Sequence, residues 1–164
     1  RDLDPSRFKE IFDTGKYSVI YFHQDLLLEG YISNGDTFRR ELAEIFNILS
    51  KYFPENRVAL KYHPCYPGDK TMVTYGEAME DFIPGELLHN DNVKMYLSLF
   101  SYALANVRKG LAVSIANLIT LRDDETREQL KEMVIGISRS EILFPKSLDE
   151  FEEILMKLCS VRKK

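Results

Sequence analysis

Hydrophobic and polar positions along the chain form two alternating patterns. The runs "YSVIYF" at 17–22 and "VALKY" at 58–62 are short, nearly continuous and apolar, as is typical of strands covered on both faces of a sheet. A helical stripe lies between them, formed by Phe38, Leu42, Ile45, Phe46 and Leu49. Asp36 precedes this stripe and is the predicted N-cap. The order strand, helix, strand predicts that the two strands run parallel.

The same alternation continues to the end of the chain. Further strands are predicted for "VKMYLSLF" at 93–100, "LAVSIANLI" at 111–119 and "EILFP" at 141–145, with a short one ending at Ile83. Helices are predicted at 86–88, at 101–107, from Asp123 or Asp124, and after Ser147 with Glu150 as a capping box. Turns and one short helix are expected between 67 and 80. Strand and helix thus alternate about six times, which predicts an α/β fold: one Rossmann-like domain with a parallel sheet and helices on both faces.

Composition narrows the class of protein. The 164 residues are enough for one domain with a single core, and 45% hydrophobic with 29% charged residues is ordinary for a globular protein. The net charge of -4 argues against nucleic-acid binding, which needs a basic surface. Cys65 and Cys159 are predicted to be free thiols, which favours a cytoplasmic location.

The two ends of the chain carry further hints. No apolar run reaches the roughly 20 residues of a membrane span, and no signal peptide is recognisable. The basic tail, formed by Lys157 and residues 162–164, is predicted to be a solvated helix end, with weak contact to an anionic membrane surface as the alternative. Because the chain begins with Arg1, we expect it to be part of a larger protein.

Polar side chains follow several of the predicted strands. His23 and Gln24 follow the first strand, His63-Pro64 follows the second, and Ser98 and Ser101 surround the end of a later one. Ligands of such folds bind beyond the carboxyl ends of the strands, so these positions predict a small-molecule site. His23 and Gln24 are equally compatible with an exposed polar pair.

Each of the other positions also has a purely structural interpretation. His63, held by Pro64, can bind a phosphate and carry a proton near neutral pH, or it can be a structural hydrogen-bonding residue. Ser101 can cap a helix whose first amides face an anion, or it can be a cap alone. Glu86 can accept hydrogen bonds from ribose hydroxyls or be a solvated helix carboxylate.

Several common motifs are missing from the sequence. There is no GxGxxG, no GxxxxGK[ST] and no GxSxG, which removes the usual support for dinucleotide, NTPase and hydrolase functions. The acidic pairs Asp123-Asp124 and Glu80-Asp81 have no His or Cys partner at suitable spacing. We therefore assign no metal site.

The order of three segments resembles a known family. "KYHP", then "FIPGELL", then "YLSLFSYAL" resembles the donor-binding half of bacterial sialyltransferases, including lipooligosaccharide and polysialic-acid (capsule) enzymes. The resemblance covers roughly residues 17 to 120 and preserves order and approximate spacing. It implies the carboxy-terminal Rossmann-like domain of a two-domain GT-B glycosyltransferase, with CMP-sialic acid as donor, no metal and no other cofactor.

The resemblance also implies roles for individual residues. His63, with Pro64 beside it, matches the catalytic histidine that contacts the CMP phosphate and helps it leave. Glu86 matches the glutamate that holds the ribose hydroxyls, and Ser101 matches the first serine of the phosphate-binding pair. Gln24 is a looser match on the donor side.

One departure concerns Tyr102, which stands where the family has a second Ser or Thr. Ser98 or the Tyr102 phenol would have to replace the lost hydroxyl. The catalytic base and the glycan-acceptor site of these enzymes lie in an amino-terminal domain whose acidic motif is missing here. We therefore expect a domain that binds the donor but cannot transfer sialic acid alone, from a bacterial enzyme of surface-polysaccharide biosynthesis at the inner face of the cytoplasmic membrane.

Two alternatives remain from the sequence. One is a domain of another cytidine- or uridine-nucleotide-dependent transferase, such as a CDP-glycerol polymerase, although these carry an Asp-Tyr-Ser-Ser run that "SLFSYAL" fits poorly. The other is a non-catalytic, flavodoxin-like nucleotide-binding module.

Overall fold

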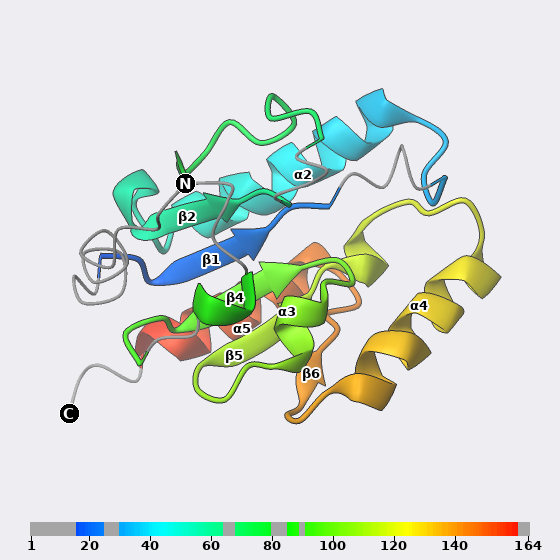
Figure 1. The fold of residues 1–164 in the computed structure, drawn as a ribbon. Helices are drawn as coiled ribbons and strands as arrows, with labels where there is room; N and C mark the ends of the chain where they lie inside the picture. The colour runs from blue at the N-terminus through cyan, green and yellow to red at the C-terminus, as the bar shows by residue number, and fades with distance from the viewer. Residues whose placement is uncertain (1–15, 25–29, 64–67, 80–84, 89–90, 161–164) are drawn as a thin grey trace, which may run out of the picture.

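The strands of the computed structural model form one parallel sheet (Figure 1). The structure describes residues 16–24, 30–63, 68–79, 85–88 and 91–160. Within them the strands are β1 (Val19–Phe22), β2 (Val58–Lys61), β3 (Glu77–Ala78), β4 (Met95–Ser98), β5 (Leu111–Ser114) and β6 (Ile142–Leu143). Their spatial order is β3-β2-β1-β4-β5-β6, and all pairs are parallel. This is the strand order of a Rossmann fold, so the predicted α/β architecture is confirmed.

Helices cover both faces of this sheet (Figure 1). The α-helices are α2 (Gly35–Ser50), α3 (Tyr102–Ala105), α4 (Asp124–Ile137) and α5 (Leu148–Ser160), and the short 3-10 helices are η1 (Glu55–Arg57), η2 (Gly85–Leu88) and η3 (Ala116–Leu118). One face packs against α2 and α5, and the other packs against α3 and η2. α4 lies beside α3.

The hydrophobic core has two parts because side chains alternate along each strand. In β1, Val19 and Tyr21 join the part beneath α2, whereas Ile20 and Phe22 join the part beneath α3. All four residues are buried. Burial on both faces therefore explains the continuous apolar runs from which the strands were predicted.

Some predicted boundaries were wrong. The N-cap of α2 is Asn34, which accepts a hydrogen bond from the Thr37 amide, so Asp36 lies inside the first turn instead. The strand predicted at 111–119 ends at Ser114, and η3 follows. The Ser114 hydroxyl donates to the Leu99 carbonyl and accepts from an amide two residues later, which turns the chain away from the sheet.

The segment at 67–80 also differs from its prediction. Its described part, residues 68–79, contains turns and the two-residue strand β3 but no helix. Most of the strand predicted to end at Ile83 lies outside the described residues. The structure describes a strand, β3, at Glu77–Ala78, where that prediction begins.

Two predicted helix starts are confirmed. Asp123 caps α4 and accepts from the Thr126 amide at 2.6 Å. Hydrogen bonds from Thr126, and then from Arg122, lower the pKa of the Asp123 carboxyl to about 2. Ser147 accepts from the Glu150 amide at 3.2 Å at the start of α5.

The cysteines and the helices can also be compared with the predictions of free thiols and of no membrane span. Cys159 is a half-buried free thiol, as predicted, whereas Cys65 lies outside the described residues. Across the described part of the chain, no helix has both the length and the apolar character needed to span a membrane.

Candidate functional site at the carboxyl edge of the sheet

The strand order reverses at β1, which lies between β2 and β4. Phe22, the last residue of β1, is in register with Lys61 of β2 and with Ser98 of β4. The three central strands therefore end at the same level. In open α/β sheets the crevice at such a reversal is where ligands bind, which makes this edge the candidate site.

The 3-10 helix η2 packs directly over the end of β1. A Cβ atom added to Gly85 would lie 3.1 Å from the Phe22 ring and 3.3 Å from Cβ of Ala103 in α3. Only glycine fits between the two without displacing a neighbour. The helix that contains Glu86 is therefore held between the end of β1 and the first turn of α3.

Ser101 is the N-cap of α3, as predicted. Its hydroxyl oxygen accepts a hydrogen bond from the Ala103 amide at 3.2 Å. A hydroxyl has one donor and two acceptor sites, so this cap leaves its proton able to donate to another group. The capping and ligand-binding interpretations of Ser101 are thus compatible with each other.

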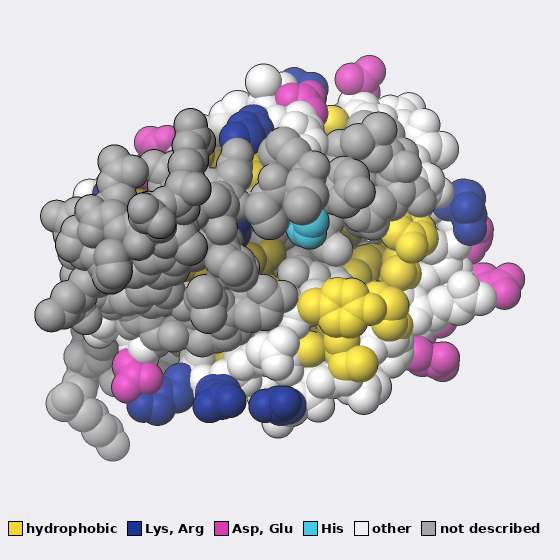
Figure 2. All heavy atoms as spheres, in the orientation of Figure 1, with side chains coloured by type: hydrophobic (Ala, Val, Ile, Leu, Met, Phe, Trp, Pro, Cys, Tyr) yellow, Lys and Arg dark blue, Asp and Glu magenta, His cyan; other side chains and the backbone are white. Residues whose placement is uncertain are grey.

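Tyr102, the first residue of α3, has an exposed side chain (57%). Its phenol donates towards Sδ of Met133 in α4, at 3.7 Å. Figure 2 shows apolar side chains gathered on this face of the molecule, over α3 and α4. The phenol is therefore directed towards α4, and its predicted replacement of the lost second hydroxyl stays a prediction.

Ser98 and Gln24 connect the ends of β4 and β1. The Ser98 side chain is fully buried, and its hydroxyl lies 2.8 Å from the Phe22 carbonyl oxygen and 3.2 Å from Oε1 of Gln24. The same Oε1 accepts from the Phe100 amide at 2.7 Å. Both residues thus have a structural role here, and their predicted nucleotide contacts stay predictions.

The end of β2 supplies cationic and imidazole groups. His63 lies just beyond β2 and is exposed. Lys61 is almost fully buried (2% exposed), and its ammonium group donates to the Tyr62 carbonyl. Lys61 was not among the predicted site residues, although one lysine in the apolar run "VALKY" was a usable signal. Pro64, predicted to orient His63, lies outside the described residues.

His23 is buried (4% exposed), so the prediction of an exposed polar pair was wrong for this residue. Its ring packs edge-on against Tyr21 and Tyr62, with centroids 5.9 Å and 5.3 Å away. Nδ1 lies 3.5 Å from the Tyr21 hydroxyl. Burial raises the pKa of the Tyr21 phenol, so this phenol stays protonated at neutral pH.

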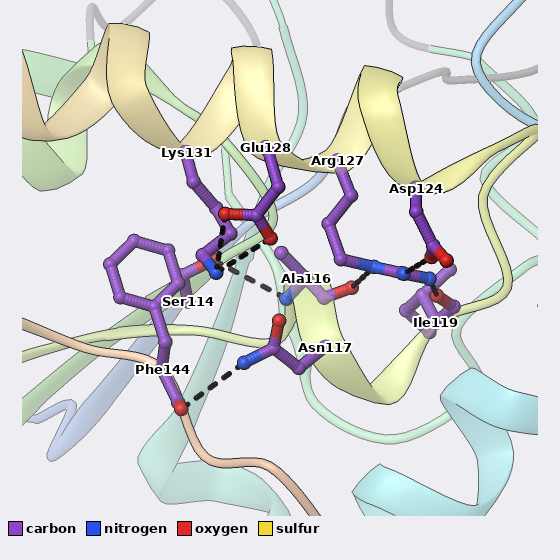
Figure 3. Close-up of polar contacts among 9 residues, drawn as sticks. All are labelled: Ser114, Ala116, Asn117, Ile119, Asp124, Arg127, Glu128, Lys131 and Phe144. Carbon is purple, nitrogen blue, oxygen red and sulfur yellow. Dashed lines mark hydrogen bonds and ion pairs between the residues drawn. The ribbon is translucent and has the colours of Figure 1, made fainter.

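A separate polar network lies between η3, which follows β5, and α4 (Figure 3). Arg127 of α4 donates to the carbonyls of Ala116 and Ile119, each at 3.3 Å. Lys131 pairs with Glu128 at 3.0 Å. Arg127 thus joins η3 to the start of α4, whereas the Lys131–Glu128 pair lies within α4, so the network has a structural explanation.

A groove of about 380 Å³ lies between α2 and residues 71–75. The residues that line it include the apolar Leu42, Phe46 and Met72. Arg39 also lines the groove and pairs with Asp69 at 3.1 Å. The groove is lined by none of the residues predicted to bind a nucleotide.

Comparisons with protein-family models, curated proteins and solved structures find no match. Within the described ranges, no group of three or more His, Cys, Asp or Glu side chains is arranged to hold a metal ion.

Proposed function

We propose that the carboxyl edge around Phe22 binds a cytidine nucleotide, and that the chain is the donor-binding domain of a sialyltransferase-like glycosyltransferase that uses CMP-sialic acid. One observation carries the proposal. The strand reversal brings the segments that contain His63, η2 and Ser101 to adjacent strand ends. These are the segments whose order along the chain resembles the sialyltransferases.

The chemistry of the edge suits a phosphate. A phosphate needs several hydrogen-bond donors and a positive potential. The Ser101 hydroxyl proton and the His63 imidazole can supply the donors, and the buried Lys61 ammonium at the end of β2 adds positive charge. Because CMP leaves as a phosphate, a donor placed at that phosphate stabilises charge that develops in the transition state.

Each residue then has a defined role in the donor site. His63 binds the phosphate and gives it a proton as the glycosidic bond breaks. Ser101 donates to a phosphate oxygen while its own oxygen caps α3. Glu86, carried by η2 beside α3, accepts hydrogen bonds from the ribose hydroxyls. The catalytic base and the glycan acceptor come from a separate amino-terminal domain, so the chain binds the donor without transferring it.

A calorimetric titration of CMP, CDP, UMP and AMP tests this proposal. We expect CMP to bind. His63→Ala and Ser101→Ala should each lower the affinity for CMP at least about tenfold, because each removes one charge-assisted hydrogen bond. Ser147→Ala is the matched control, because it removes the same kind of cap from α5. Preference for CDP would favour a CDP-glycerol-type transferase. A folded sample that binds no nucleotide would contradict the proposal.

A further inference from the structure

The amide group of Gln24 has a fixed orientation. The Phe100 backbone N–H can only donate, so the Gln24 atom 2.7 Å away must be the carbonyl oxygen Oε1. The contact with Ser98 alone would not decide between the two amide orientations. The Ser98 hydroxyl has a single proton, and the Phe22 carbonyl and Oε1 of Gln24 both lie within hydrogen-bonding distance of it. The NH₂ group of Gln24 therefore points away from Phe100.

This NH₂ group is available to a ligand. Gln24 lies two residues beyond the end of β1 and is only partly buried. Among the described residues, its hydrogen bonds all run through Oε1, so neither proton of Nε2 is committed to the protein there. The orientation is set before any ligand arrives, so a ligand does not have to immobilise this side chain.

We propose that Nε2 of Gln24 donates a hydrogen bond to the phosphate of the nucleotide bound at the carboxyl edge. The inference rests on the proposed function and assigns one more phosphate contact within that site. Oε1 holds Gln24 against Phe100, and Phe100 directly precedes Ser101. The phosphate is then bound from both sides of the strand reversal, by Gln24 after β1 and by Ser101 after β4.

The substitution Gln24→Glu removes the NH₂ donor of this side chain and keeps an oxygen acceptor. One carboxylate oxygen still accepts from Phe100, while the other replaces the NH₂ donor with a negatively charged acceptor. We expect an unchanged thermal midpoint and an affinity for CMP that is lower by roughly 10- to 100-fold. The affinity for cytidine, which has no phosphate, should stay within about twofold. Asn47→Asp adds the same charge on an exposed turn of α2 and should change neither affinity.

A second measurement uses the unmodified chain and does not depend on the variant folding. We expect the side-chain NH₂ signals of Gln24 in a ¹⁵N correlation spectrum to shift with CMP and not with cytidine. Equal CMP binding by the wild type and Gln24→Glu would overturn the inference and leave the proposed function intact. Equal loss of CMP and cytidine would overturn the phosphate assignment. Failure of the wild type to bind CMP would overturn both proposals.

Discussion

Tyr102 is the position at which the sequence departs from the sialyltransferase pattern that it resembles, and Tyr102→Ser tests how much affinity for CMP a hydroxyl at this position adds. The tyrosine side chain is 57% exposed, and its phenol contacts Met133 at 3.7 Å. If a tyrosine can bury about 200 Å², less than half of that is buried here, which corresponds to at most about 2 kcal/mol. Removing the ring should therefore lower the thermal midpoint by no more than about 8 °C.

Tyr102→Ala is the matched control for this experiment, because both variants lose the same ring. A serine hydroxyl that reaches the phosphate should contribute about 1.5–3 kcal/mol, or roughly 10- to 100-fold in affinity. We therefore expect Tyr102→Ser to bind CMP at least about tenfold more tightly than Tyr102→Ala by calorimetry. Equal affinities of the two variants would refute the reasoning, because they would mean that the first residue of α3 does not face the phosphate.

Two further predictions concern stability. Gly110 has φ +82°, and a Cβ there would lie 2.7 Å from the Val93 carbonyl oxygen, whereas a Cβ on Gly136 within α4 would meet no atom within 4 Å. Gly110→Ala should thus lower the free energy of unfolding in urea by about 1–2 kcal/mol or more, and Gly136→Ala should raise it by roughly 0.5–1 kcal/mol; changes of the same sign would contradict this account. The Asp123 carboxyl has a pKa of about 2, below its ordinary value of 3.8, so its stabilising contribution is present above pH 4 and is lost as the pH falls through 2. Between pH 4 and 2 the thermal midpoint should fall more for the wild type than for Asp123→Asn, because asparagine is also a good N-cap but does not titrate. An equal fall of the thermal midpoint in both proteins would show that the cap does not titrate in this range.

Much of the fold could be predicted because the sheet is covered on both faces. The continuous burial of Val19–Phe22 and Val58–Lys61 leaves runs that have few alternatives to parallel strands. The Ser101 cap was predictable for a similar local reason, since the serine and the amide that it satisfies are two residues apart. Local patterns thus specify the strands, and Ser101 specifies the start of α3.

The errors arose where distant or closely competing partners decide the structure. Asn34 and Asp36 are both good N-caps, and only the backbone conformation selects Asn34. The end of β5 depends on the Ser114 hydroxyl bonding to Leu99, a residue of the preceding strand connection. Residue type alone also predicts an exposed Lys61, because buried lysines are rare.

The Gln24 contact is the clearest case of information that the sequence does not reveal. Gln24 and Phe100 are 76 positions apart, and neither type of residue signals the other. The contact forms because β1 and β4 become neighbours in the sheet. The resemblance placed Gln24 near a donor, whereas the structure gives its carbonyl oxygen a partner within the protein.

A crystal structure of the chain with CMP tests the central claim most directly. The account predicts the phosphate within hydrogen-bonding distance of the Ser101 hydroxyl and the His63 imidazole, with the nucleotide lying across the ends of β1 and β4. CMP bound in the groove between α2 and residues 71–75, or no CMP in crystals grown at saturating nucleotide, would contradict it.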